Sequence, residues 1–258
     1  MQPNTIRTRG VKFAFLFGPP RFVGRDEAAK LYGCVCDKLS HDDLTFRYST
    51  TEAEAKPTSR GFAINLARKE GRGGFGIIVT HKGGNEPIRV LFDYGWPPSM
   101  PHVEELFDSA SAAVFDSLEG EWQKVLAETR IRAECAVRGQ DALSYIRERL
   151  ICVSSSTIES FGTPLAFASI RLDTSSSGDT DDAIAGPARQ LTVEVLQEDR
   201  KSVYLELVSQ WTQYPEIATE VDITKSRPFN ANPTDYVKDS YEFLCARVHD
   251  LAGEEGGS

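Results

Sequence analysis

The feature that most restricts the fold is an internal echo between two stretches that lie far apart in the chain. Val221–Gly253 reads as a short strand, a proline-bearing loop and an amphipathic helix that stops at a glycine, and Val90–Gly120 reads in the same way. Pro87 precedes the first stretch as Pro215 precedes the second. This pattern indicates that the 258 residues are organised as two similar halves.

The first half contains five strand patterns and two helix patterns. Apolar residues at every second position predict strands at Val11–Phe17, Leu44–Tyr48, Phe62–Leu66, Phe75–Val79 and Ile88–Phe92. Apolar residues at helical spacing predict helices at Asp26–Leu39 and Val103–Leu118. Continuation of the second helix through Trp122 and Val125 is left open by the pattern.

The second half repeats this order. Alternation predicts strands at Ile131–Val137, Pro164–Leu172, Leu191–Val195, Val203–Leu207 and Ile217–Ile223. One helix is predicted from Asp141 to Leu150, and a last helix ends at Leu251, with Asn232 as its N-cap and Pro233 at its first position. Residues 174–187 are rich in Ser, Asp and Gly, which predicts a mobile loop.

Each half is therefore a strand, a helix, four strands and a helix. Two tandem copies of that order resemble the saddle fold of the TATA-box-binding protein family, in which two repeats share one antiparallel sheet with helices on one face. The resemblance implies an α+β fold of two β-α-β-β-β-β-α repeats, at residues 11–120 and 121–253, with flexible termini at 1–10 and 254–258. No sequence motif of that family is present, so neither residue roles nor DNA binding carry over.

Composition and charge bear on location and partners. The 29 basic and 38 acidic residues give a formal charge of −9, which opposes non-specific attraction to nucleic acid or an anionic membrane. No apolar run approaches the roughly 20 residues of a membrane span, and the N-terminal sequence lacks the features of a secretory signal. Five scattered cysteines are typical of reduced, buried thiols. We therefore expect a cytoplasmic protein.

No pattern of catalytic or metal-binding residues stands out. The glycine-rich stretch Glu70–Gly76 leads into a strand pattern, whereas a phosphate-binding loop leads into a helix, so we interpret it as a hairpin turn. His41–Asp43 places an imidazole beside carboxylates, a combination that is usual in turns. The histidines lack the spacing of metal ligands. We predict no catalytic residue, no metal site and no cofactor.

Two stretches are candidates for ligand binding. Tyr94 and Trp96 precede Pro97-Pro98 at a corner between a strand and a helix. Aromatic residues at such corners usually close the end of the core, and a ligand pocket is the alternative. Between Lys56 and Arg89 there are seven basic and two acidic residues, so Arg72 and Arg89 are candidates to hold an anion.

The strand alternation also predicts an interaction surface. In the first half, the strand residues that point away from the helices are mostly small or apolar, and they include Leu16, Ile78 and Leu91. We expect this face to be covered by a protein partner or a second copy of the chain, unless a β-bulge exchanges the two faces. The corresponding residues of the second half are mostly acidic, which predicts no binding of duplex DNA: Arg132, Glu134, Glu194, Glu206, Glu220 and Asp222.

Three functions are compatible with these patterns. The leading hypothesis is a non-enzymatic binding or protein-interaction module built from a duplicated unit. The second is an enzyme, a hydrolase or transferase, whose site follows no recognisable motif. The third is a sensor of nucleotides or small anions that uses Arg72 and Arg89.

Overall fold

The structure is a computed structural model of the chain. It describes residues 6–18, 25–39, 44–52, 60–68, 73–81, 87–117, 123–137, 141–152, 154, 156, 167–174, 187–212 and 232–252. Within these residues the strands are β1 (Arg7–Gly18), β2 (Leu44–Glu52), β3 (Arg60–Arg68), β4 (Gly74–His81), β5 (Ile88–Gly95), β6 (Gln123–Ala136), β7 (Ser169–Thr174), β8 (Ala188–Val195) and β9 (Ser202–Thr212). The helices are α1 (Arg25–Lys38), α2 (Met100–Ser117), α3 (Ala142–Tyr145), the π-helical turn η2 (Ile146–Ile151) and α5 (Pro233–Ala252).

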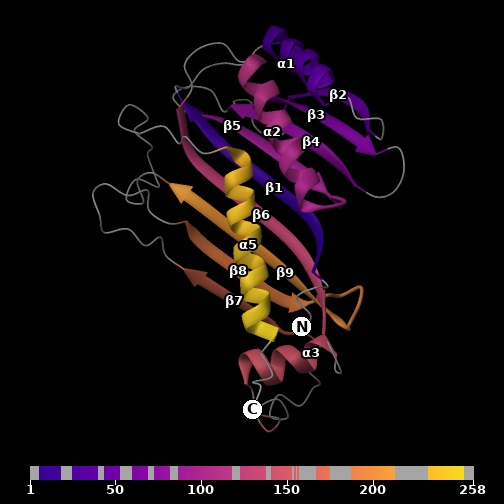
Figure 1. Ribbon diagram of the computed structural model, residues 1–258, viewed down its shortest axis with the longest axis vertical. Helices are drawn as coiled ribbons and strands as arrows, with labels where there is room; N and C mark the ends of the chain where they lie inside the picture. The colour runs from indigo at the N-terminus through magenta and orange to yellow at the C-terminus, as the bar shows by residue number, and fades with distance from the viewer. Residues whose placement is uncertain are drawn as a thin grey trace, which may run out of the picture.

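All nine described strands join in a single open sheet. Their order is β2-β3-β4-β5-β1-β6-β9-β8-β7, and every neighbouring pair is antiparallel (Figure 1). The central contact is between β1 and β6, so strands from the first part of the chain lie on one side of it and strands from the second part on the other. The predicted α+β class with an antiparallel sheet is confirmed.

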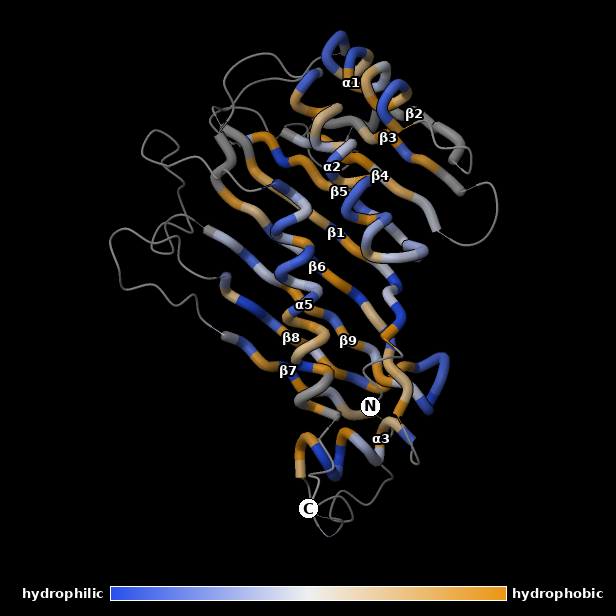
Figure 2. The backbone as a smooth tube through the Cα atoms, in the orientation of Figure 1, coloured by the Kyte–Doolittle hydropathy of each residue, from blue (hydrophilic) through white to orange (hydrophobic). Residues whose placement is uncertain are grey.

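The central strands of the sheet bury one face. Phe13, Phe15, Val90 and Phe92 have no exposed surface. Ala14 is buried too, whereas the other alternate residues are half-buried or exposed, namely Lys12, Leu16, Arg89, Leu91 and Asp93. The same alternation runs along β6 and β9, and apolar and polar positions alternate along the strands in Figure 2. The predicted phase of the strands is therefore confirmed, because a shift of one residue would have exchanged the two faces.

Helices α1, α2 and α5 cover the buried face (Figure 1). Helix α2 packs residues at spacings of three and four positions into the core, among them Val103, Phe107, Ala110 and Val114. Helix α5 begins at Pro233, directly after Asn232, as the sequence predicted. No described helix lies on the opposite side of the sheet, which we call the helix-free face. In the described part of the chain, no helix is long and apolar enough to cross a membrane.

Two boundaries differ from the sequence predictions. Strand β1 begins at Arg7 instead of Val11, so part of the expected flexible N-terminus is in the sheet, and Arg7 pairs with Glu134. Strand β6 begins at Gln123, so the helix that is described as far as Ser117 does not continue through Val125. Neither extra segment alternates apolar with polar residues in the way that predicts a strand. Their strand conformation comes from pairing with a central neighbour, which a local pattern does not reveal.

The strands that flank β1 and β6 do not have the same rank in the predicted order of the two halves, because β5 is the fifth strand of the first half and β9 is the fourth of the second. Strand β5, the last strand of the first half, lies beside β1, and β9 takes the corresponding place beside β6. The strand predicted at 217–223 and the matching residue Pro215 lie outside the described residues, as does the loop at 175–186.

Candidate functional site

The predicted aromatic corner contains an unusual backbone conformation. Strand β5 ends at Gly95, and Trp96 follows with φ 54°, in the left-handed region. This region is uncommon for a bulky side chain, so surrounding contacts must hold it there. One such contact is the hydrogen bond from the Trp96 N–H to the carbonyl oxygen of Arg9, at 2.9 Å.

Two arginines from the start of β1 lie over the Trp96 ring. The guanidinium carbons of Arg7 and Arg9 are 5.2 and 4.8 Å from the ring centroid, which is within the range of cation–π interactions. Arg9 is the extra residue of a β-bulge, because the register between β1 and β6 shifts between Thr8 and Gly10. The bulge and the left-handed residue therefore meet at one point of the sheet.

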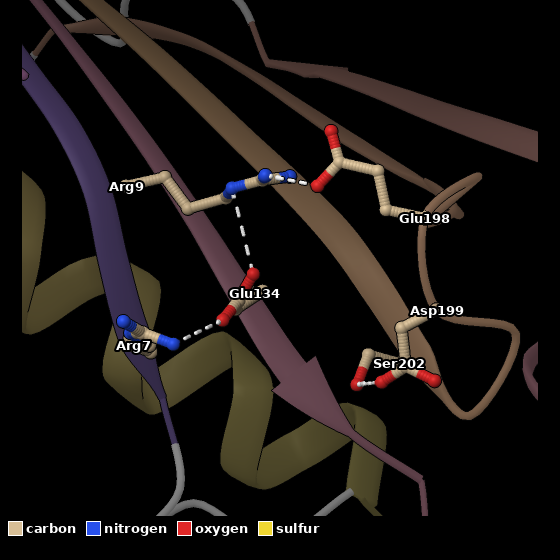
Figure 3. Close-up of polar contacts among 6 residues, drawn as sticks. All are labelled: Arg7, Arg9, Glu134, Glu198, Asp199 and Ser202. Carbon is tan, nitrogen blue, oxygen red and sulfur yellow. Dashed lines mark hydrogen bonds and ion pairs between the residues drawn. The ribbon is translucent and has the colours of Figure 1, made fainter. Parts of the chain in front are cut away.

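The two arginines share acidic partners unequally (Figure 3). Arg9 Nε lies 3.4 Å from Glu134 Oε2, and Arg9 Nη2 lies 2.6 Å from Glu198 Oε2. Arg7 Nη1 lies 3.5 Å from Glu134 Oε1. The Arg9 side chain is 16% exposed, whereas that of Arg7 is 70% exposed. Arg9 therefore joins β1 to β6 and to the turn before β9, while Arg7 remains open to solvent.

The turn that carries Glu198 is held by its neighbour Asp199. Ser202 Oγ donates to Asp199 Oδ2 at 2.7 Å (Figure 3). The N–H of Lys201 donates to Asp199 Oδ1 at 3.0 Å. The hydrogen bond from Ser202 is the main reason that the pKa of Asp199 is lowered. These bonds favour the ionised carboxylate and hold the turn in the conformation that presents Glu198 to Arg9.

A pocket of about 570 Å³ opens beside Trp96. It is lined by residues 6–8 at the start of β1, by Trp96–Met100 and by Tyr241 of α5. Ser99 caps α2, since its Oγ accepts from the His102 N–H at 3.4 Å. The first turn of α2 contains no acidic residue. The partial positive charge of the helix N-terminus at this pocket is therefore not offset by a carboxylate in that turn.

The predicted ligand-binding residues have different positions. Trp96 lines the pocket, whereas Tyr94 has no exposed surface and packs its ring against Phe75, as expected for a residue that closes the end of the core. Arg89 is exposed near the opposite end of β5, and Arg72 lies outside the described residues. Of the described members of the predicted set, Trp96 alone lines the pocket.

Arg7 and Arg9 were missed by sequence reasoning. They lie in the stretch that was expected to be a flexible terminus, and neither belongs to an apolar alternation. The only local signal was the pair of basic residues just before the predicted strand. Its significance depends on Trp96, which lies some ninety positions further along the chain.

The described end of the glycine-rich stretch, from Gly73 onward, leads directly into a strand. Gly73 has φ 98°, and a Cβ at this position would lie 2.0 Å from the carbonyl oxygen of Gly95, so only glycine fits. Strand β4 begins at the next residue, Gly74. The expectation that this stretch leads into a strand instead of a helix is confirmed.

The helix-free face of the first half carries an apolar strip. Ala63, Ile78, Leu91 and Ala14 are consecutive cross-strand neighbours on β3, β4, β5 and β1. Ile78 and Leu91 are half-buried, as is Leu16 on β1, and the two alanines are buried by the side chains around them. We call Ala63, Ile78, Leu91 and Ala14 the apolar strip.

Charged residues flank the apolar strip. Two residues further along β5, Asp93 Oδ2 lies 2.6 Å from Lys12 Nζ, and its Oδ1 lies 4.0 Å from Arg132 Nη2. On the other side of the strip is Arg89, and no carboxylate in the described part of the chain forms an ion pair with it. The apolar strip of the first half therefore lies between Arg89, which has no ion-pair partner among the described residues, and Asp93.

The same face of the second half is richer in charge. Glu128 and Glu134 on β6, Glu194 on β8 and Glu206 on β9 share it with two arginines of β6, Arg130 and Arg132. Two further carboxylates that were predicted here, at positions 220 and 222, lie outside the described residues.

The function has to be inferred from the geometry of the structure, because comparison with known proteins does not indicate one. No protein-family model matches the chain, and no curated protein matches it closely enough to indicate a relationship. Within the described ranges, no group of three or more His, Cys, Asp or Glu side chains is arranged to hold a metal ion.

Proposed function

We propose that the protein is a non-enzymatic interaction module that binds a second copy of itself through the helix-free face of its first half. The apolar strip is the observation on which this rests. An antiparallel sheet with one face in water normally alternates apolar residues with polar ones. Here four cross-strand neighbours in succession are apolar or small on the face that no described helix covers. Such a surface is typical of protein association.

Charge favours a second copy as the occupant. When identical faces pack on each other, the twofold axis lies in the plane between the two sheets. If that axis runs along the apolar strip, Leu91 meets Leu91 of the second copy, and residues two positions to either side exchange places. Arg89 then lies over Asp93 of the second copy, and the symmetry creates this pair twice. The contact would give Arg89 the carboxylate that its own chain lacks in the described residues.

The experiment is to replace Ile78 and Leu91 together with aspartate. Four buried charges at a twofold contact should abolish association, because unpaired buried charges are costly. Size-exclusion chromatography with light scattering measures the mass, and circular dichroism checks the fold. Val208→Asp is the matched control, since Val208 lies on the same face of β9 outside the apolar strip.

Three results would contradict the proposal. They are a monomeric wild type at ~100 μM, where interfaces of ordinary strength are populated, a double variant that still associates, and a control that dissociates equally. If the double variant unfolds, Arg89→Glu tests the same contact at an exposed side chain. Retained association of that variant would also contradict the proposal.

We further propose that the two halves are diverged copies of one unit, arranged as in the saddle fold of the TATA-box-binding protein family. The matched order of elements and the central position of β1 and β6 support this proposal. In a strict duplication, the strand predicted at 217–223 would lie beside β6 as β5 lies beside β1, whereas β9 occupies that place. An experimental structure in which residues 11–118 and 131–251 do not superpose would contradict it.

A further inference from the structure

We propose that the pocket beside Trp96 binds a small organic anion, in which a carboxylate or phosphate group is attached to an apolar or aromatic body. This site shares no residue with the apolar strip and goes beyond the association proposed above. The argument rests on the unequal roles of two arginines, on the pocket's walls and on its volume.

Arg7 and Arg9 differ in how far their N–H donors are still available to a ligand. Arg9 already holds Glu198 at 2.6 Å and Glu134 at 3.4 Å, and it is largely buried. The contact of Arg7 with Glu134 is 3.5 Å, longer than the roughly 2.7–2.9 Å of a strong charge-assisted hydrogen bond. Its guanidinium therefore retains donors for an anion, and 70% of its side chain is exposed at the pocket.

The Trp96 ring restricts the Arg7 side chain before any ligand arrives. The guanidinium carbon lies 5.2 Å from the ring centroid. A planar guanidinium held in this way presents its fork of N–H groups at low entropic cost, and that fork matches the oxygens of a carboxylate or phosphate. The N-terminus of α2 also lines the pocket and has no acidic residue in its first turn, so it adds positive potential there.

The remaining walls include apolar side chains that can contact the body of such an anion, beside polar groups. Pro97 and Met100 line the pocket and are largely buried, and Trp96 lines it as well. Tyr241 also lines the pocket, and burial raises the pKa of its hydroxyl. A volume of about 570 Å³ is in the range of sites for small organic molecules.

Calorimetric titration of the full chain tests the proposal with three probes of similar shape. Benzoate and phenyl phosphate carry the anion, and benzamide is the neutral counterpart. We expect at least one anion to bind ~10-fold or more tightly than benzamide, the effect of one charge-assisted hydrogen-bond pair. Tighter binding of phenyl phosphate would identify the natural group as a phosphate, and tighter binding of benzoate would identify it as a carboxylate.

Arg7→Gln should weaken binding of the preferred anion ~10-fold or more, because it removes the charge and the fork. Arg171→Gln is the matched control, since Arg171 is an exposed arginine on β7 and should leave the affinity unchanged. Three results would overturn the proposal: no binding of either anion up to ~10 mM, equal binding of benzamide, or an Arg7→Gln variant with unchanged affinity.

Discussion

The side-chain oxygens of Thr129 on β6 and Ser240 on α5 lie 2.5 Å apart, and neither residue has exposed surface. Ser240 Oγ donates onward to Ser209 Oγ on β9 at 3.1 Å. Because Ser240 has a single hydroxyl proton, Thr129 is the donor in the first bond. The three hydroxyls satisfy one another and join α5 to two strands at one position. Sliding α5 along the sheet would leave them buried and unpaired.

We expect Ser240→Ala to destabilise the protein by about 2 kcal/mol, since it removes the partner of two buried hydroxyls. Urea unfolding measures the change in free energy of unfolding. The control is the triple variant Thr129→Val, Ser209→Ala, Ser240→Ala, which removes every member of the chain. It should be less destabilised than the single variant, because no buried hydroxyl is left unpaired. A triple variant that is less stable than Ser240→Ala would contradict this account.

Two tyrosines should make stability fall at alkaline pH. Burial raises the pKa of Tyr236 to about 12, and burial together with the charge of Glu206 raises the pKa of Tyr204 to about 12. The unfolded chain releases these protons near pH 10, whereas the folded chain still holds them. The free energy of unfolding therefore begins to fall at about pH 10. The stability that these tyrosines contribute is fully present below that pH, and it is lost as the pH rises through about 12.

The measurement is urea unfolding at several pH values between about 9 and 12, compared with a variant that carries Tyr204→Phe and Tyr236→Phe. Phenylalanine keeps the ring of Tyr236 against Trp211, whose centroid lies 4.9 Å away. The variant should lose less stability over this range than the wild type. Equal slopes for the two proteins would show that these groups do not control the alkaline transition.

Charge reversal gives a specific test of the proposed pairing between copies. Arg89→Glu should weaken self-association, because it places two carboxylates opposite each other, and Asp93→Lys should do so by placing two cations together. In an equimolar mixture, Glu at 89 faces Lys at 93, and the native Asp93 faces the native Arg89. Light scattering should therefore detect a dimer in the mixture and not in either variant alone. A mixture that remains monomeric would contradict the proposed orientation of the two copies.

We predict that the sheet does not bind duplex DNA. The helix-free face of β6, β8 and β9 carries four carboxylates and two arginines, and phosphate binding depends on an excess of Lys and Arg. A gel shift with random duplex at low salt, with protein in the low micromolar range, measures this directly. A shifted band that disappears as salt is raised would show that the prediction is wrong.

Local patterns were sufficient for most strands and for their phase. The alternation of Phe13 and Phe15, and of Ile131 and Ala133, follows from the opposite directions of successive side chains in a strand. The same local chemistry identified Pro233 as the start of the last helix. The residues of the apolar strip could be named for the same reason, since a correct phase assigns each strand residue to a face.

The remaining strand boundaries, the strand order and the pocket depend on contacts between segments that are distant in the sequence. The start of β1 at Arg7, the early start of β6 at Gln123 and the place of β9 beside β6 depend on strand pairing, which no local alternation encodes. The Trp96 pocket brings together residues 6–8, 96–100 and 241, and its geometry rests on a bulge and a left-handed backbone. Alternation reports which way a side chain points, and only the folded chain determines what it meets there.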